Sequence, residues 1–189
     1  MMKMKLVAIG LLFGFCASAP ALSLNKVQPN MGLNENTDIS SLIRNAENEV
    51  RQGRYTEAIT LYKQANSLAA EKNSGCKPTN TPFIAGENYY YDMALAYRVW
   101  GKSQVPAIRR GNYRKALATL DMAVKCETTY QQAMRRMKFL EGFLNSDLGQ
   151  SEASLKAFQE ARAFPIGDSN IANNQIDSLI ARIKQVLKK

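Results

Sequence analysis

The sequence contains no histidine among its 189 residues. This absence excludes Ser-His-Asp and Cys-His catalytic arrangements, and it also excludes histidine-based zinc sites. Acidic residues are scarce as well, because only 16 of them accompany 25 lysines and arginines, which gives a net charge of +9. This balance favours anionic partners in general without selecting one. The sequence shows neither a phosphate-cradling glycine loop nor a four-ligand metal spacing, so we predict no catalytic residue, no metal and no cofactor.

Long apolar runs are also missing, with one exception near the first residue. The run Leu6–Ala19 has 14 residues, which is shorter than the roughly 18 that a membrane-spanning helix requires. Two lysines precede this run, and Ala19-Pro20-Ala21 follows it as a small-x-small cleavage site. We therefore expect residues 1–21 to be a cleaved signal peptide of the bacterial secretory type, which would place the protein in the periplasm or outside the cell. A retained anchor and lipidation at Cys16 are the alternatives.

Cleavage at this site would leave only two of the three cysteines, Cys76 and Cys126. In an oxidising compartment a disulfide is the natural pairing of two such residues. On the chain-entropy account, the bond would stabilise the fold by about 4 kcal/mol. Two separate free thiols are the alternative.

The remaining chain shows helical periodicity and no alternating segment of strand length. We expect residues 22–37 to form a flexible polar segment and the protein to be all-α. The predicted helices are 38–52, 55–72, 86–100, 112–126, 129–148, 151–164 and 170–187.

Three stretches of this sequence are alike: QGRYTEAITLYKQA, RGNYRKALATLDMA and LGQSEASLKAFQEA. When Gly53, Gly111 and Gly149 are aligned, small residues recur five and twelve positions later, and a large apolar residue recurs nine positions later. Glycine allows a sharp turn after a helix, and small residues allow two paired helices to approach closely. The pattern therefore predicts three helix pairs, each with a glycine turn.

At these residues the chain resembles the tetratricopeptide repeat (TPR), whose unit is a helix-turn-helix of about 34 residues. Ala46, Ala94 and Gly142 add to the resemblance, because each lies seven residues before a glycine, where such a repeat packs its two helices together. The resemblance covers residues 38–166 and implies a helix-turn-helix repeat solenoid of about three TPR-like units. Residues 167–189 would then provide a C-terminal capping helix.

The resemblance also implies a groove for a partner, lined by the first helix of each unit. Counting back from the glycines gives the lining positions Ile43, Arg44, Glu47, Arg51, Asn88, Tyr91, Asp92, Leu95, Arg98, Arg136, Phe139, Leu140 and Phe143. Tyr91, Phe139 and Phe143 are candidate anchors, because aromatic residues and arginine dominate interface energetics. The alternative is that the last helix folds over this face and buries them. Our leading hypothesis is a non-enzymatic exported scaffold that binds another envelope protein or peptide.

The middle unit is longer than the others because it contains two additions, residues 73–86 and 102–111. Long loops in compact domains are often functional, and we expect Pro106 to interrupt helical continuity. No acid occurs from Met93 to Leu120, whereas this stretch contains Arg98, Lys102, Arg109, Arg110, Arg114 and Lys115. We therefore predict a basic loop. The alternative function is binding of a polyanion, an anionic lipid or the envelope surface through residues 98–115. A merely solvated loop is the plainer interpretation. Nucleic acid is not expected as a partner. Self-association of an incompletely capped repeat end is a further alternative.

Overall fold

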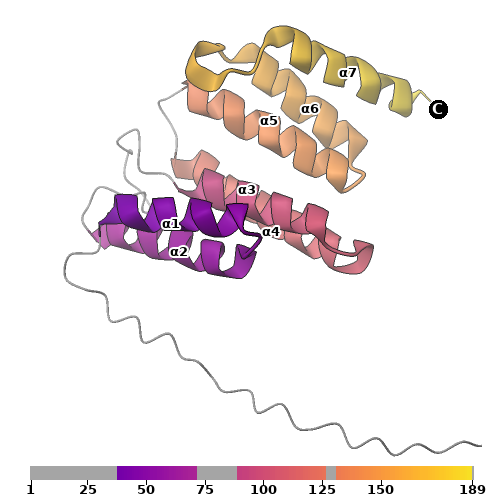
Figure 1. Cartoon of the computed structure of the whole chain (residues 1–189). Helices are drawn as coiled ribbons and strands as arrows, with labels where there is room; N and C mark the ends of the chain where they lie inside the picture. Colours follow the sequence, from indigo (N-terminus) through magenta and orange to yellow (C-terminus); the bar gives the residue numbers. More distant parts are fainter. Residues whose placement is uncertain (1–37, 72–88, 127–130, 189) are drawn as a thin grey trace, which may run out of the picture. The chain divides into compact units, whose positions relative to one another are not determined.

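A computed structural model describes residues 38–71, 89–126 and 131–188 of the protein (Figure 1). Its helices are α1 (Ile39–Arg51), α2 (Tyr55–Glu71), α3 (Tyr90–Ser103), α4 (Pro106–Cys126), α5 (Gln131–Asp147), α6 (Ser151–Ala163) and α7 (Asn173–Leu187), with a short 3-10 helix, η1 (Gly167–Ser169), before α7. These residues form no β-strand, which confirms the all-α prediction for this part of the chain. The expected signal peptide, the segment 22–37, Asn88 and the whole addition 73–86 lie outside the described residues.

Neighbouring helices pack against one another throughout the described chain. The most extensive packing is between α3 and α4, then between α5 and α6 and between α1 and α2. Less extensive contacts join α2 to α3, α4 to α5 and α6 to α7. Each helix therefore contacts the helices that precede and follow it in the sequence.

The residues that the glycine alignment singled out are buried in all three pairs. Five positions after each glycine lies a small residue that is fully buried, and nine positions after it lies a large residue at most 3% exposed. These residues are Ala58, Ala116 and Ser154, then Tyr62, Leu120 and Phe158, and twelve positions on, Ala65, Ala123 and Ala161. Ser154 also joins its pair directly, because its hydroxyl donates a hydrogen bond of 2.7 Å to the carbonyl of Gly142. The predicted packing positions are confirmed.

Two of the three predicted glycine turns are confirmed. Gly53 and Gly149 have φ angles of +75° and +78°, a conformation that glycine adopts at little cost and that ends many helices. The amide of Arg54 donates to the carbonyl of Glu49, and the amide of Gln150 donates to the carbonyl of Asn145. These bonds close the last turns of α1 and α5.

The third predicted turn, at Gly111, is wrong. Gly111 lies inside α4, which begins at Pro106, while α3 continues to Ser103. Only Gln104 and Val105 connect the two helices. Proline is well tolerated in the first turn of a helix, because the amide that it lacks would have no helical partner there. The expected interruption of helical continuity lies at Gln104 and Val105, directly before Pro106, and Pro106 itself begins α4.

The α5–α6 pair is tied to the chain that leads into α7 by Arg135. This side chain is 0% exposed and donates to the carbonyls of Ala161, Phe164 and Ile171 and to the side-chain oxygen of Asn173, with distances of 2.8 Å from Nη2 to both Ile171 and Asn173. Buried guanidinium groups require such partners, since the loss of hydration is otherwise uncompensated. Arg135 thus fixes the path from α6 to α7.

Candidate functional site

The residues predicted to line a groove lie on α1, α3 and α5. Arg44 on α1 and Arg136 on α5 are exposed, and Tyr91 and Arg98 on α3 are half-buried. Leu95, also on α3, is 38% exposed, whereas most large apolar side chains of the described chain are half-buried or buried. The described residues of the predicted lining therefore include arginine, tyrosine and leucine side chains together with the acidic Glu47 and Asp92.

Arg98 is engaged in a contact between α3 and α5. Its Nε lies 2.8 Å from Oδ2 of Asp147, and its guanidinium carbon lies 4.6 Å from the centre of the Phe143 ring. A charge-assisted bond combined with a cation–π contact holds the side chain in one orientation. Arg98 thus connects two helices, and a partner that binds it has to compete with Asp147.

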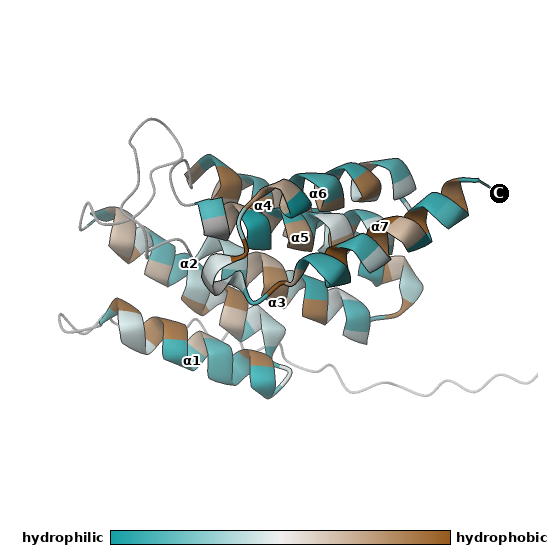
Figure 2. Ribbon diagram, turned by 90° about the horizontal axis from the view of Figure 1, so that it is seen from above, coloured by the Kyte–Doolittle hydropathy of each residue, from teal (hydrophilic) through white to brown (hydrophobic). Residues whose placement is uncertain are grey.

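Phe139 and Phe143 are not open anchors. With Phe158 they form a cluster of edge-to-face rings, in which the centres of Phe139 and Phe143 are 4.9 Å apart. The apolar side of α7 packs on this cluster through Ile176, Leu179, Ile180 and Ile183, and Figure 2 shows the alternation of brown and teal along α7 that separates this side from its polar one. Phe139 and Phe143 are therefore half-buried, which agrees in part with the alternative that the last helix covers these side chains.

One of the predicted lining residues, Asp92, has a carboxyl group whose shifted ionisation the sequence pattern did not indicate. Burial of Asp92 and, to a lesser extent, the negative charge of Glu47 raise the pKa of the Asp92 carboxyl to about 6, and Arg136 opposes this effect. Burial and the charge of Asp92 also raise the pKa of Tyr91. These side chains from α1, α3 and α5 are therefore electrostatically coupled, and Asp92 is the most strongly shifted carboxyl of the described chain.

The predicted basic loop is also wrong as a loop. Lys102 lies in the last turn of α3, and Arg109, Arg110, Arg114 and Lys115 lie along α4. Four of these side chains are exposed, whereas Arg109 is half-buried and donates two hydrogen bonds, of 3.2 and 3.0 Å, to the carbonyl of Gln104. These basic side chains therefore project from helices and do not lie in a loop.

The aromatic residues interleaved with these bases serve packing. Tyr113 is 3% exposed. Trp100 stacks on Tyr97 and on Tyr55 of α2, with ring centres 6.3 and 6.4 Å apart. These rings are therefore engaged in packing within the fold.

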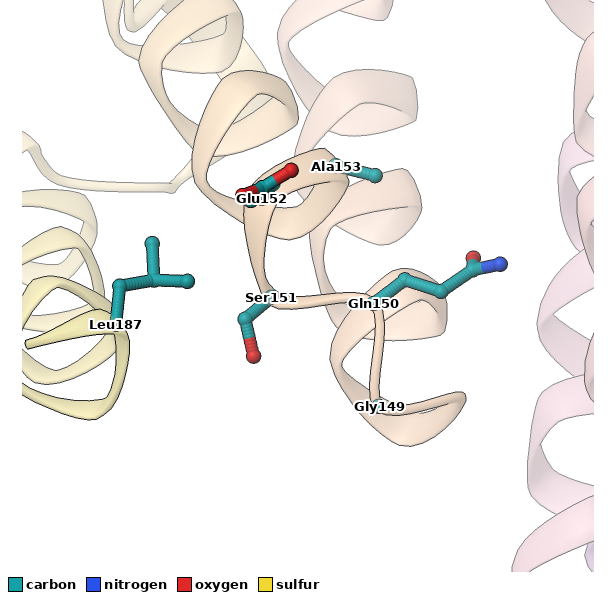
Figure 3. A pocket seen from close by; sticks show the side chains of 6 residues that line it. All are labelled: Gly149, Gln150, Ser151, Glu152, Ala153 and Leu187. Carbon is teal, nitrogen blue, oxygen red and sulfur yellow. The ribbon is translucent and has the colours of Figure 1, made fainter. Parts of the chain in front are cut away.

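A shallow pocket of about 540 Å³ lies at the turn between α5 and α6 (Figure 3). Its lining consists of residues 149–153 and Leu187 at the end of α7. Glu152 is the only acidic or basic side chain among the lining residues, so the pocket contains no acid–base pair. A smaller pocket of about 110 Å³ between α4 and α5 includes Lys138, whose ammonium is paired with Glu141 and Glu160 at 2.9 and 2.8 Å.

Cys126 is buried at the end of α4, at 3% exposure, whereas Cys76 lies outside the described residues. The Cys76–Cys126 disulfide therefore stays a prediction. Within the described ranges no three Cys, Asp or Glu side chains are grouped so that they could hold a metal ion. None of the helices in these ranges is both long enough and apolar enough to cross a membrane.

No protein-family model matches the chain, and no curated protein matches its sequence significantly.

Proposed function

We propose that this protein is a TPR-like scaffold, a helix-turn-helix repeat solenoid that binds a segment of another protein through the faces of α1 and α3. The observation that carries the proposal is the burial of equivalent small and large residues in three successive helix pairs. Sequential contacts from α1 to α7 support it further, because in repeat proteins each unit packs on its neighbours. The protein would act by binding, without catalysis, after export to the periplasm or the exterior.

The packing of α7 moves the proposed binding surface away from Phe139 and Phe143. The side chains that remain accessible are Tyr91 and Leu95 on α3, with Arg44 and Arg136 on the flanking helices. Aromatic, aliphatic and arginine side chains are typical of protein–protein interfaces. The coupled carboxyls Asp92 and Glu47 add negative charge to the centre, which suits a basic side chain of the partner.

The proposal is tested by replacing Tyr91 and Leu95 together with alanine in the full chain and by measuring recovery of the co-purified partner. Truncation of two central side chains costs about 2 kcal/mol or more at such interfaces. We therefore expect recovery to fall by about thirty-fold or more while the helical circular dichroism is retained.

The matched control is Ile166→Ala. Ile166 is 41% exposed, close to the 38% of Leu95. It follows α6 in the sequence and directly precedes η1, so it is not among the predicted lining residues. Its removal should leave recovery unchanged. Equal recovery by the double variant and the control would contradict the groove.

A further inference from the structure

The turn between α3 and α4 carries an exposed apolar patch. Val105 is 60% exposed and Ile108 is 52% exposed. Pro106 and Ala107 between them are exposed too. Side chains three positions apart at the start of a helix lie on neighbouring parts of its surface, so the two aliphatic groups form one patch at the end of a helix pair.

This turn extends beyond the corresponding turns of the other pairs. Helices α1 and α5 end two residues before Gly53 and Gly149, whereas α3 ends two residues after Gly101. Helix α4 begins seven residues before Tyr113, while α2 and α6 begin at the equivalent positions Tyr55 and Ser151. At 1.5 Å per residue, the additions lengthen the pair by about 6–10 Å.

Basic side chains lie close to the patch in the sequence, and no acidic residue occurs from Met93 to Leu120. Lys102 and Arg110 lie within five residues of Val105, and Arg114 and Lys115 follow one turn later on α4. All four are exposed, and none is in an ion pair within the described chain. Arg109 is excluded from this set, because it is bonded to Gln104.

We propose that the α3–α4 turn, residues 102–115, docks on an anionic lipid surface. Val105 and Ile108 insert at the level of the headgroups, and Lys102, Arg110, Arg114 and Lys115 contact lipid phosphates. A lipid interface stabilises both kinds of group, because aliphatic side chains insert into it and basic side chains are attracted to its anionic headgroups. A nucleic acid or soluble polyanion offers no apolar phase for Val105 and Ile108, and the nearby rings are engaged in stacking. The inference goes beyond the proposed scaffold function, because it uses no groove residue.

The test is co-sedimentation of the full chain with vesicles of phosphatidylcholine, with and without phosphatidylglycerol, at low and at physiological salt. We expect binding only to the vesicles that contain phosphatidylglycerol and a decrease in binding with salt. Replacing Lys102 and Arg110 with glutamine should weaken binding about thirty-fold, because each base near an anionic surface contributes roughly a factor of five. Replacing Val105 and Ile108 with serine should weaken it about ten-fold or more.

Two control variants separate docking at this turn from general effects. Lys63→Gln with Arg182→Gln removes the same charge from exposed positions on α2 and α7, and Ile166→Ser with Val186→Ser removes exposed apolar groups elsewhere. Both controls should bind as the parent does. The proposal is overturned if the parent binds equally well with and without phosphatidylglycerol. It is also overturned if the charge control weakens binding as much as the Lys102 and Arg110 variant, or if the serine variant of the turn binds as the parent does. The last result would show that the charges bind the vesicles without any insertion of Val105 and Ile108.

Discussion

The α5–α6 pair and the α3–α4 pair bury equivalent residues but are connected differently. In α5–α6 a glycine with positive φ ends the first helix, and three residues form the turn. In α3–α4 the helices continue further, two residues connect them, and Pro106 begins the second helix. Helix–helix packing therefore determines the buried positions, while the turn depends on local backbone preferences. The two features can change independently within one chain.

The same comparison explains why glycines at these pairs have different roles. A β-carbon added at Gly142 would lie 2.6 Å from the Phe158 ring, and one added at Gly101 would lie 2.6 Å from the Tyr113 ring. A β-carbon added at Gly111 would meet nothing within 4 Å. Gly142 and Gly101 thus allow close packing, and Gly111 is an exposed helical glycine.

The largest effect is expected from Arg135, which anchors α5–α6 to the chain before α7. We expect Arg135→Met to lower the free energy of unfolding by about 4 kcal/mol, because several buried acceptors lose their donor. Denaturant unfolding followed by circular dichroism measures this change. Arg98→Met, which removes a half-buried link between α3 and α5, is the matched comparison and should cost about 1–2 kcal/mol. An equal loss in both variants would show that burial of Arg135 is unimportant.

The next effect is expected at the two packed glycines. Gly142→Ala and Gly101→Ala should each lower the free energy of unfolding by about 2–3 kcal/mol, because a methyl group would overlap an aromatic ring in a dense core. Thermal unfolding of the two variants beside the parent provides the measurement. If alanine is tolerated at either position, the close approach of that helix pair is wrong.

A third difference between the pairs is the carboxyl of Asp92, which occupies the position on α3 that buried Leu140 has on α5. In the folded state the pKa of the Asp92 carboxyl is about 6, against an ordinary value of 3.8. The folded protein therefore binds more protons than the unfolded chain between about pH 4 and pH 6, and its stability falls as the pH rises through this window. Asp92→Asn should increase the free energy of unfolding at pH 8 by about 2 kcal/mol, after allowance for partial exposure of the group.

Denaturant unfolding from pH 4 to pH 8 tests this prediction. The difference between Asp92→Asn and the parent should be large at pH 8 and vanish near pH 4. A constant difference over the whole range would mean that the ionisation of Asp92 has no energetic consequence.

The smallest effects are expected to have opposite signs at two glycines that are alike in sequence. Gly111→Ala should stabilise the protein by about 0.5–1 kcal/mol, since alanine is the better residue inside an exposed helix. Gly149→Ala should destabilise it by about 1 kcal/mol, because the φ angle of +78° is unfavourable for alanine. The melting temperatures of both variants measure these changes. A lower melting temperature of Gly111→Ala than of the parent would support a turn at Gly111.

The sequence was informative where one physical requirement produced a repeated pattern. Small residues at Ala58, Ala116 and Ser154 are required by close helix packing, and their spacing made the buried positions predictable. Pro106 and Gly111 were misinterpreted because proline is compatible with both a break and a first helical turn, and glycine with both a turn and a helix. Their local sequences do not distinguish these states.

The features that could not be predicted depend on contacts between distant segments. Arg135 looks like any surface arginine of an amphipathic helix until the carbonyls before α7 surround it. For Phe139 the sequence left two alternatives, an open anchor or a side chain covered by the last helix, because no sequence pattern indicates where α7 packs. The exposure of Val105 and Ile108 likewise depends on the lengths of α3 and α4 together.

Site-specific photo-cross-linking in the cell tests the central claim most directly. A photoreactive residue would replace Leu95 on the proposed binding face of α3 or, in a second strain, exposed Lys63 on α2. The scaffold account predicts a discrete adduct with one partner from position 95 and none from position 63. Adducts from position 63 alone, or equal adducts from both positions, would contradict a binding face on the first helices of the pairs.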